Sequence, residues 1–224
     1  MYVGNNLDFN DMFEEKLCEY TNANHAVCVD CCTNAILISL YLKTLLGEFG
    51  RGATLLVPNR TYMSVPMTLK LFGFNVVLDT EPWFGRYQIF RMDGDEVKET
   101  GVYDAAVEFR ETMMDSFPYD ALVCLSFQQK KRLNLGRGGA ILTNNTDYYV
   151  KLKRLVHDGR NPKIYHGDEI ERDASSILCG FHSYLEPEKA ARGLMMLNQS
   201  QLLPPYVEHS SEEYPDLSQL GVIK

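Results

Sequence analysis

The sequence has no apolar run that approaches the roughly 18 residues needed to cross a membrane. It begins with the polar stretch MYVGNNLDFN, which does not resemble a secretory signal peptide. Basic residues are in the minority, because 30 Asp and Glu outnumber 22 Lys and Arg and leave a net charge of -8. A nucleic-acid-binding surface needs a concentrated basic face, and only residues 130–137 and 151–160 come close to one. We therefore expect a cytoplasmic protein that binds neither nucleic acid nor a membrane.

The sequence also has too few paired cysteines for a zinc site. Cys28 and Cys31 form a C-x-x-C pair, but no second pair follows to complete the four ligands of a structural zinc. Cys28 and Cys124 lie inside apolar, strand-like stretches, where a free cysteine packs as a small hydrophobic residue. We expect no metal site and mostly packing roles for the six cysteines, at positions 18, 28, 31, 32, 124 and 179.

The chain does contain a regular alternation of strand-like and helix-like segments. Strands are predicted at residues 25–30, 53–58, 75–79, 101–105, 120–127 and 138–143, with a weaker one at 87–90. Helices are predicted from about Asp11 onwards and at 33–50, 61–73, 147–159 and 187–203, with a short one near 107–114 and a polar loop at 160–178. This alternation predicts an α/β fold in which a mostly parallel sheet is covered by helices on both faces.

The weaker pattern between residues 80 and 100 and the change in composition near Pro204 suggest how the chain is divided. We expect residues 1–203 to form one α/β domain, shortened between 80 and 100. We expect residues 204–224 to form an acidic, loosely held tail.

Ligands of such sheets bind beyond the carboxyl ends of the strands. This rule selects four polar junctions, at residues 30–34, 59–62, 103–106 and 126–139. The predicted helix start at Cys32 and Thr33, together with the hydroxyls of Thr33 and Ser126, would suit an anion such as phosphate. The common nucleotide-binding motifs G-x-x-x-x-G-K-[ST] and G-x-G-x-x-G have no match in the sequence.

The residues at these junctions resemble the motifs of a known family. Ser126-Phe127, a lysine five residues after the serine, and Gly138-Gly139-Ala140-Ile141 look like the lysine motif of the DegT/StrS family of pyridoxal-phosphate (PLP) sugar aminotransferases. Further similarity follows in the family's order, in Thr61-Tyr62, in Tyr103-Asp104-Ala105-Ala106, in the pattern from Phe13 to Ala35 and in the segment 180–193. With gaps, the resemblance extends from Phe13 to Leu203.

The resemblance implies the fold-type I PLP-dependent transferase large domain, in truncated form, and two catalytic residues. Lys131 would form the resting Schiff base with PLP and carry protons, and its neighbour Lys130 is the competing candidate. Asp104 would keep the ring nitrogen of PLP protonated. A plain structural role remains open for Asp104, because aspartate is also a good N-cap for a following helix.

Further cofactor contacts are implied by the same resemblance. Tyr62 would stack on the ring, Thr33 and Ser126 would hold the phosphate, and His182 would reach the phosphate of a partner subunit. The cofactor-binding set is therefore Cys32, Thr33, Tyr62, Asp104, Ser126, Gln128, Lys131 and His182. Cys32 stands where the family has glycine, and Gln128 where it often has histidine. Each of these residues could instead be an ordinary cap, turn or core residue, and Arg132 and Arg137 could contact a nucleotide diphosphate or stay solvated.

The function implied is transfer of an amino group from an amino acid, glutamate in most relatives, to a keto-sugar nucleotide by a homodimer. Related sugar dehydratases replace the lysine with histidine, so Lys131 argues against that reaction. The alternative is a relative that binds PLP or a nucleotide sugar, or serves as a partner chain, without turnover. Val107 in place of the family's glutamine, the short segment from Asp79 to Asp104 and the lack of the family's C-terminal small domain favour this alternative.

Overall fold

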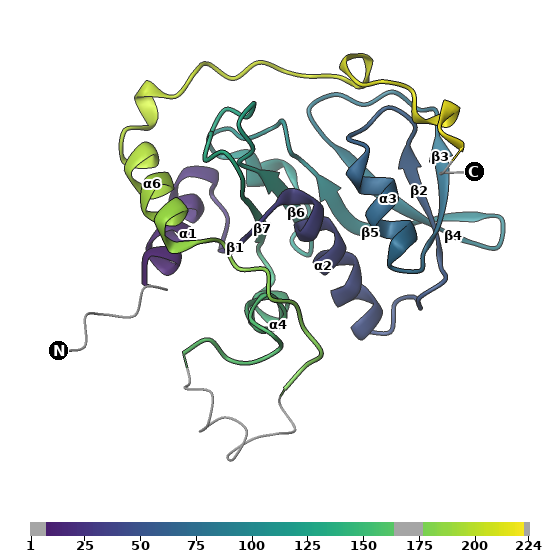
Figure 1. Cartoon of the computed structure of the whole chain (residues 1–224), viewed down its shortest axis with the longest axis horizontal. Helices are drawn as coiled ribbons and strands as arrows, with labels where there is room; N and C mark the ends of the chain where they lie inside the picture. The colour runs from purple at the N-terminus through teal and green to yellow at the C-terminus, as the bar shows by residue number, and fades with distance from the viewer. Residues whose placement is uncertain (1–7, 164–176, 222–224) are drawn as a thin grey trace.

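The computed structural model describes residues 8–163 and 177–221, which form a sheet with helices on both faces (Figure 1). Within these residues the sheet has seven strands in the order β1-β7-β6-β5-β4-β2-β3. The strands are β1 His25–Val29, β2 Thr54–Pro58, β3 Asn75–Asp79, β4 Tyr87–Asp93, β5 Glu96–Asp104, β6 Leu122–Ser126 and β7 Gly139–Thr143.

The sheet is mixed, and the expectation that it is mostly parallel was wrong. Only the pairs β2–β3 and β5–β6 are parallel, whereas β1–β7, β6–β7, β4–β5 and β2–β4 are antiparallel. Two connections cause the difference. Gly94, with a φ of 62°, makes the tight turn of a β4–β5 hairpin, and a loop without a crossover helix returns the chain from β6 to β7.

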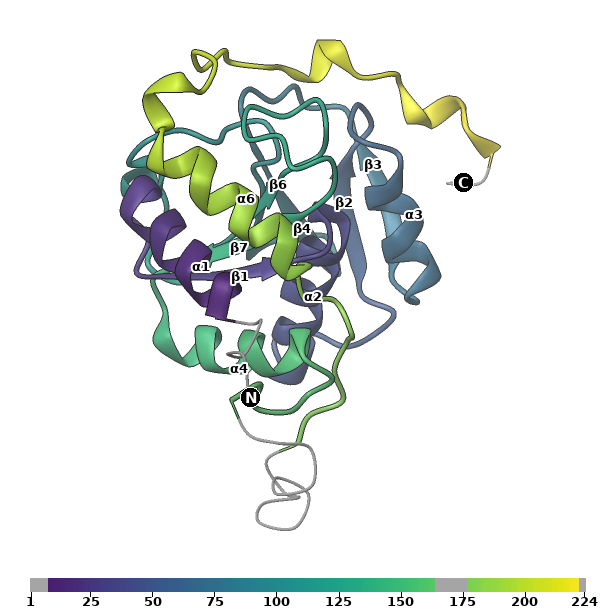
Figure 2. The same cartoon turned by 60° about the vertical axis from the view of Figure 1, so that its left-hand side comes forward.

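The helices divide into two layers, as predicted (Figures 1 and 2). Buried side chains of α2, α3 and α4 pack together against one face of the sheet, and those of α1 and α6 pack against the other. Successive residues of β6 alternate between the two layers, since Leu122 and Cys124 join the first core and Val123 and Leu125 join the second. The helix bounds are α1 Asp8–Thr21, α2 Cys32–Leu45, α3 Ser64–Leu71, α4 Thr146–Val156 and α6 Pro187–Asn198.

The predicted helix near 107–114 is absent from the described residues. The chain forms turns there, followed by the 3₁₀ helix Met113–Ser116. Thr112 has a φ of 51°, a left-handed conformation that an α-helix cannot contain, so it ends any helical path. Most of the predicted polar loop at 160–178 lies outside the described residues.

The C-terminal segment, residues 204–221, does not form the loosely held tail that was expected. It crosses the top of the molecule in Figure 1 and returns to the side of β2 and α3. Leu217 is buried and its N–H donates to the carbonyl of Asn59 (2.8 Å), and the side chain of Asn59 donates to Asp216 (3.0 Å). Arg60 donates to the carbonyl of Tyr214 (2.8 Å). These bonds attach the segment to the residues that follow β2.

Candidate active site

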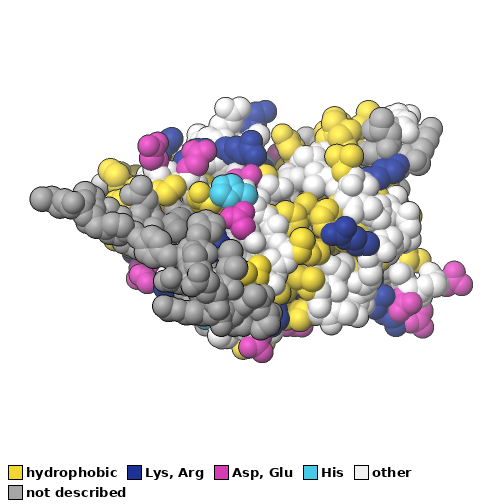
Figure 3. Space-filling view, turned by 60° about the horizontal axis from the view of Figure 1, so that its bottom comes forward, with side chains coloured by type: hydrophobic (Ala, Val, Ile, Leu, Met, Phe, Trp, Pro, Cys, Tyr) yellow, Lys and Arg dark blue, Asp and Glu magenta, His cyan; other side chains and the backbone are white. Residues whose placement is uncertain are grey.

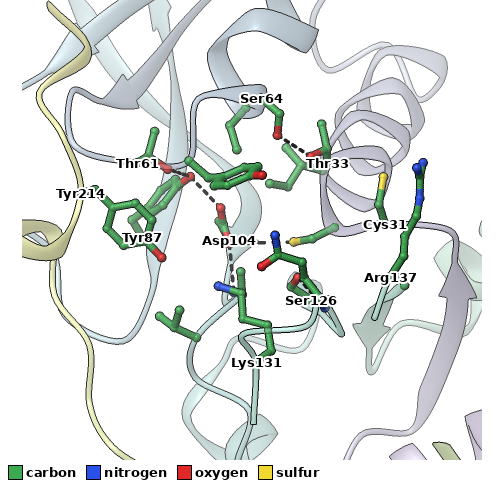
Figure 4. Close-up of a pocket in the computed structure, with 18 of the residues that line it drawn as sticks. Cys31, Thr33, Thr61, Ser64, Tyr87, Asp104, Ser126, Lys131, Arg137 and Tyr214 are labelled. Carbon is green, nitrogen blue, oxygen red and sulfur yellow. Dashed lines mark hydrogen bonds between the residues drawn. The ribbon is translucent and has the colours of Figure 1, made fainter. Parts of the chain in front are cut away.

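A cavity of about 370 Å³ opens at the carboxyl ends of β5 and β6 (Figure 4). Because β5 and β6 are parallel neighbours, Asp104 and Ser126 end their strands at the same edge of the sheet. Seven of the eight residues predicted to bind a cofactor line this cavity: Cys32, Thr33, Tyr62, Asp104, Ser126, Gln128 and Lys131. The structure therefore gathers residues from four distant parts of the sequence into one pocket.

The Asp104 carboxylate is buried in the wall of the cavity. Its Oδ1 accepts a hydrogen bond from the N–H of Ala106 (2.9 Å), and its Oδ2 accepts one from the hydroxyl of Tyr87 (2.7 Å). Burial raises the pKa of Asp104, although the hydrogen bonds from Tyr87 and Ala106 and the charge of Lys131 oppose this shift. A positive group placed in the cavity would therefore stabilise the ionised carboxylate.

Lys131 lies on the loop that follows β6, where its N–H donates to the carbonyl of Gln128 (2.8 Å). Burial lowers the pKa of Lys131, and the negative charge of Asp104 only partly offsets the effect. No residue in the described part of the chain accepts a hydrogen bond from its Nζ. Lys130, by contrast, is exposed and does not line the cavity. The geometry thus distinguishes the two lysines.

The N-terminus of α2 forms another wall. Its N-cap residue, Cys31, makes no side-chain capping bond, and the hydroxyl of Thr33 hydrogen-bonds with that of Ser64 (2.6 Å). Gly139 lies directly against this helix start, because a Cβ on it would be 2.7 Å from the N atom of Cys32. The first N–H groups of a helix lack partners within the helix, so a helix start that another backbone segment approaches closely is suited to an anion.

Cys32 occupies the position where the family has glycine, and its thiol points into the wall. Its Sγ is 3.7 Å from the carbonyl of Cys124 and 4.0 Å from Oδ1 of Asp104. Burial, together with the negative charge of Asp104, raises the pKa of Cys32 well above its usual value. The thiol is therefore neutral and serves as packing beneath the site.

The remaining predicted residues differ in exposure. Ser126 is buried, and its hydroxyl accepts a long hydrogen bond from the N–H of Gln128 (3.4 Å). Tyr62 is 56% exposed and belongs to the rim of the cavity. His182 lies outside the cavity, where its exposed ring contacts Asp158 (3.0 Å). Its predicted contact with a partner subunit stays a prediction.

The two arginines also have different positions. Arg132 donates to the hydroxyl of Tyr20 and to the carbonyls of Phe109 and Pro204, so it ties the loop to the protein rather than to solvent. Arg137 lines the cavity and reaches the carboxylate of Asp30 at 3.4 Å.

Several residues of the site belong to no recognisable sequence motif and were not predicted from the sequence. Tyr87 contacts Asp104 because the two are paired across the β4–β5 hairpin. Its sequence signal was the Asp93-Gly94 dipeptide, which is typical of hairpin turns. The ring of Trp83 lies 5.3 Å from that of Tyr87 and 5.4 Å from that of Tyr214. Trp83, Tyr87 and Tyr214 form one aromatic wall of the cavity, and no local pattern places Tyr214 there.

Comparison with known proteins shows that part of the chain is similar to a known family. Residues 4–83 match the DegT/DnrJ/EryC1/StrS aminotransferase family. The match confirms the resemblance that the sequence motifs indicated, and it includes α2, Thr33 and Tyr62 of the cavity. No curated protein matches the chain.

Several solved structures have a similar fold. NtdA from Bacillus subtilis, with bound cofactor PMP, is 18% identical (TM-score 0.63), and the match covers 87% of this chain and 48% of NtdA. DesV of S. venezuelae, solved with a ketimine intermediate, is 19% identical (TM-score 0.57), and the match covers 88% of this chain and 58% of DesV. Helicobacter pylori PseC, an aminotransferase of pseudoaminic acid biosynthesis, is 19% identical (TM-score 0.58), and the match covers 86% of this chain and 58% of PseC. The chain thus spans about half to three fifths of each structure.

Proposed function

We propose that the cavity binds PLP and that the protein transfers an amino group from an amino acid to a keto-sugar nucleotide. The observation that carries the proposal is Lys131: a partly buried lysine that has no hydrogen-bonded partner among residues 8–163 and 177–221 and that faces the same cavity as the buried Asp104 carboxylate. NtdA, which has a similar fold, was solved with the bound cofactor PMP, the amine form of PLP.

The residues of the cavity fit the chemical groups of PLP. Its phosphate suits the start of α2, with the hydroxyls of Thr33 and Ser126. Its ring nitrogen suits Asp104: burial raises the pKa of this carboxyl, and a protonated nitrogen beside it would stabilise the ionised form. The ring of Tyr62 on the rim is available for stacking.

The protein residues then have distinct tasks. When bound, PLP supplies an electron sink for reactions at the carbon of an amine substrate. Burial lowers the pKa of Lys131, so a larger fraction of the protein molecules carry this side chain as the neutral amine. The neutral amine is the form that can attack a carbonyl or take up a proton. Asp104 stabilises a proton on the ring nitrogen. Trp83 and Tyr214 cover one side and exclude water.

The substrate classes rest on the family resemblance. We expect glutamate as the amino donor, and Arg137 on the cavity wall is a candidate contact for an anionic group of either substrate. A second function, binding without turnover, is favoured by Val107, which lines the cavity where the family has glutamine.

Assembly, location and domain division stay predictions. Figure 3 shows several separate groups of hydrophobic side chains on the face that it draws, and the homodimer is expected from the family resemblance. No helix in the described ranges is long and apolar enough to span a membrane, and we expect the cytoplasm as the location. We also expect residues 1–203 to hold the cofactor, with Tyr214 added from the segment 204–224.

The proposal is tested by adding PLP to the purified protein. Trp83 is the only tryptophan in the sequence and lines the cavity, so its fluorescence should be quenched while visible absorbance appears. Glutamate should then yield 2-oxoglutarate in a single turnover. Absence of PLP binding would refute the proposal, whereas binding without 2-oxoglutarate would favour the non-catalytic alternative.

A further inference from the structure

A chain of hydroxyl groups leads from the loop before α3 to Asp104. The hydroxyl of Thr61 lies 2.6 Å from the hydroxyl of Tyr87, which lies 2.7 Å from Oδ2 of Asp104. All three side chains are buried. Figure 4 shows Thr61, Tyr87 and Asp104 in line along one side of the cavity.

The charge of Asp104 fixes the direction of these bonds. An ionised carboxylate only accepts, so Tyr87 must donate its single proton to Asp104. The Tyr87 oxygen is then free to accept, and Thr61 donates to it. Burial and the negative charge of Asp104 raise the pKa of Tyr87 well above its usual value, so the phenol keeps the proton it donates.

The hydroxyl of Tyr87 does more than fill space. The aromatic ring packs against Trp83 at 5.3 Å, a contact that phenylalanine could make equally well. A buried hydroxyl stabilises a protein only when hydrogen bonds to protein groups replace those it made to water. Here the hydroxyl of Tyr87 is hydrogen-bonded to Thr61 and Asp104.

We propose that Tyr87, held in place by Thr61, is a positioning residue that keeps the Asp104 carboxylate ionised and aimed into the cavity. This inference deepens the proposed function and rests on it in one respect, since the ligand would be the protonated ring nitrogen of PLP. The hydrogen-bond chain itself is a property of the protein without any ligand.

Several groups besides Tyr87 act on the charge of Asp104. They come from α2, β6, the loop after β6 and the C-terminal segment: Cys32, Cys124, Lys131 and Tyr214. Lys131 is the basic group among them. The pKa values of the two thiols and the phenol are raised, so these groups stay neutral. The ionised carboxylate is therefore supported by the hydrogen bonds from Tyr87 and the N–H of Ala106 and by the charge of Lys131.

The first experiment needs no cofactor. The pKa of Asp104 is measured by carbon-13 NMR of its side chain in the free protein and in Tyr87→Phe, Thr61→Val and Thr61→Ser. We expect Tyr87→Phe to raise the pKa, Thr61→Val to raise it less, and Thr61→Ser to restore the wild-type value. Tyr103→Phe is the control, because Tyr103 precedes Asp104 on β5 but packs on Phe117 of the opposite core. An unchanged pKa in Tyr87→Phe would overturn the inference, even if PLP never binds.

The second experiment measures affinity for PLP and for its analogue with carbon in place of the ring nitrogen, followed by Trp83 fluorescence. A hydrogen bond to a charged group predicts that Tyr87→Phe weakens PLP binding by about tenfold or more. The loss should vanish for the analogue. If Tyr87→Phe lost the same affinity for both ligands, Tyr87 would act only by packing and the inference would be overturned. If the wild type failed to bind PLP, the proposed function would be refuted instead.

Discussion

Two lysines of this protein lie beside buried carboxylates, and their surroundings shift the pKa values of the two side chains in opposite directions. Lys153 of α4 donates to Glu14 (2.8 Å) and Asp11 (3.0 Å) of α1. Burial alone would lower the pKa of Lys153, but these carboxylates outweigh it and raise the pKa. Lys131 has no such bond within the described residues, and burial lowers its pKa.

The comparison separates a structural ion pair from a binding site. Glu14 also accepts a hydrogen bond from the N–H of Cys28, so both of its carboxylate oxygens are hydrogen-bonded and the cluster joins α1, α4 and β1. The pair of Lys131 and Asp104 is incomplete and faces a cavity. Groups whose pKa values are shifted by burial in a cavity are typical of functional sites.

The largest effect on stability should come from the structural pair. Lys153→Met leaves the Glu14 carboxylate buried without its partner and should cost about 3–5 kcal/mol of unfolding free energy. Lys131→Met removes an ammonium that donates to no residue in the described part of the chain, and it should change stability by less than about 1 kcal/mol. Urea unfolding at neutral pH measures both, and equal losses would remove the distinction between the two sites.

A smaller effect should follow from disturbing the cavity without touching either lysine. In Gly139→Ala the added Cβ would lie 2.7 Å from the N atom of Cys32 and from the carbonyl oxygen of Leu125. We expect a loss of about 1–3 kcal/mol and weaker PLP binding, as α2 is pushed away. Gly50→Ala is the matched control, because no atom lies within 4 Å of its Cβ position. If Gly139→Ala bound PLP normally, the helix start would not be part of the site.

The smallest effect concerns alkaline pH. The pKa of Lys131 is lowered in the folded protein, so between that lowered value and the ordinary 10.5 the unfolded chain holds more protons and stability rises with pH. The raised pKa of Lys153 has the opposite sign, and its contribution is lost as pH rises through the folded value. Each contributes at most about 1.4 kcal/mol per pH unit.

This sign difference can be measured by urea unfolding at a series of pH values up to 10.5. Compared with the wild type, Lys131→Met should make stability fall more steeply with pH, and Lys153→Met should make it fall less steeply. If both variants changed the slope of stability against pH in the same direction, the opposite pKa shifts of Lys131 and Lys153 would be contradicted.

The sequence predicted the site where local pattern and topology agree. Asp104 and Ser126 end two predicted strands that are parallel neighbours, so the rule for strand ends applied even though most of the sheet is antiparallel. Lys131 followed from the resemblance to the family's lysine motif, in which the lysine comes five residues after the serine. Contacts that depend on strand register or on distant packing could not be predicted. Tyr87 meets Asp104 across a hairpin, and Tyr214 arrives from a segment fixed by Arg60.

The most direct test of the account is to reduce the complex of protein and PLP with borohydride and to map the labelled peptide by mass spectrometry. We predict that the cofactor is fixed to Lys131, that Lys130→Ala is labelled like the wild type, and that Lys131→Ala is not labelled. Labelling at Lys130, or labelling that survives in Lys131→Ala, would contradict the account.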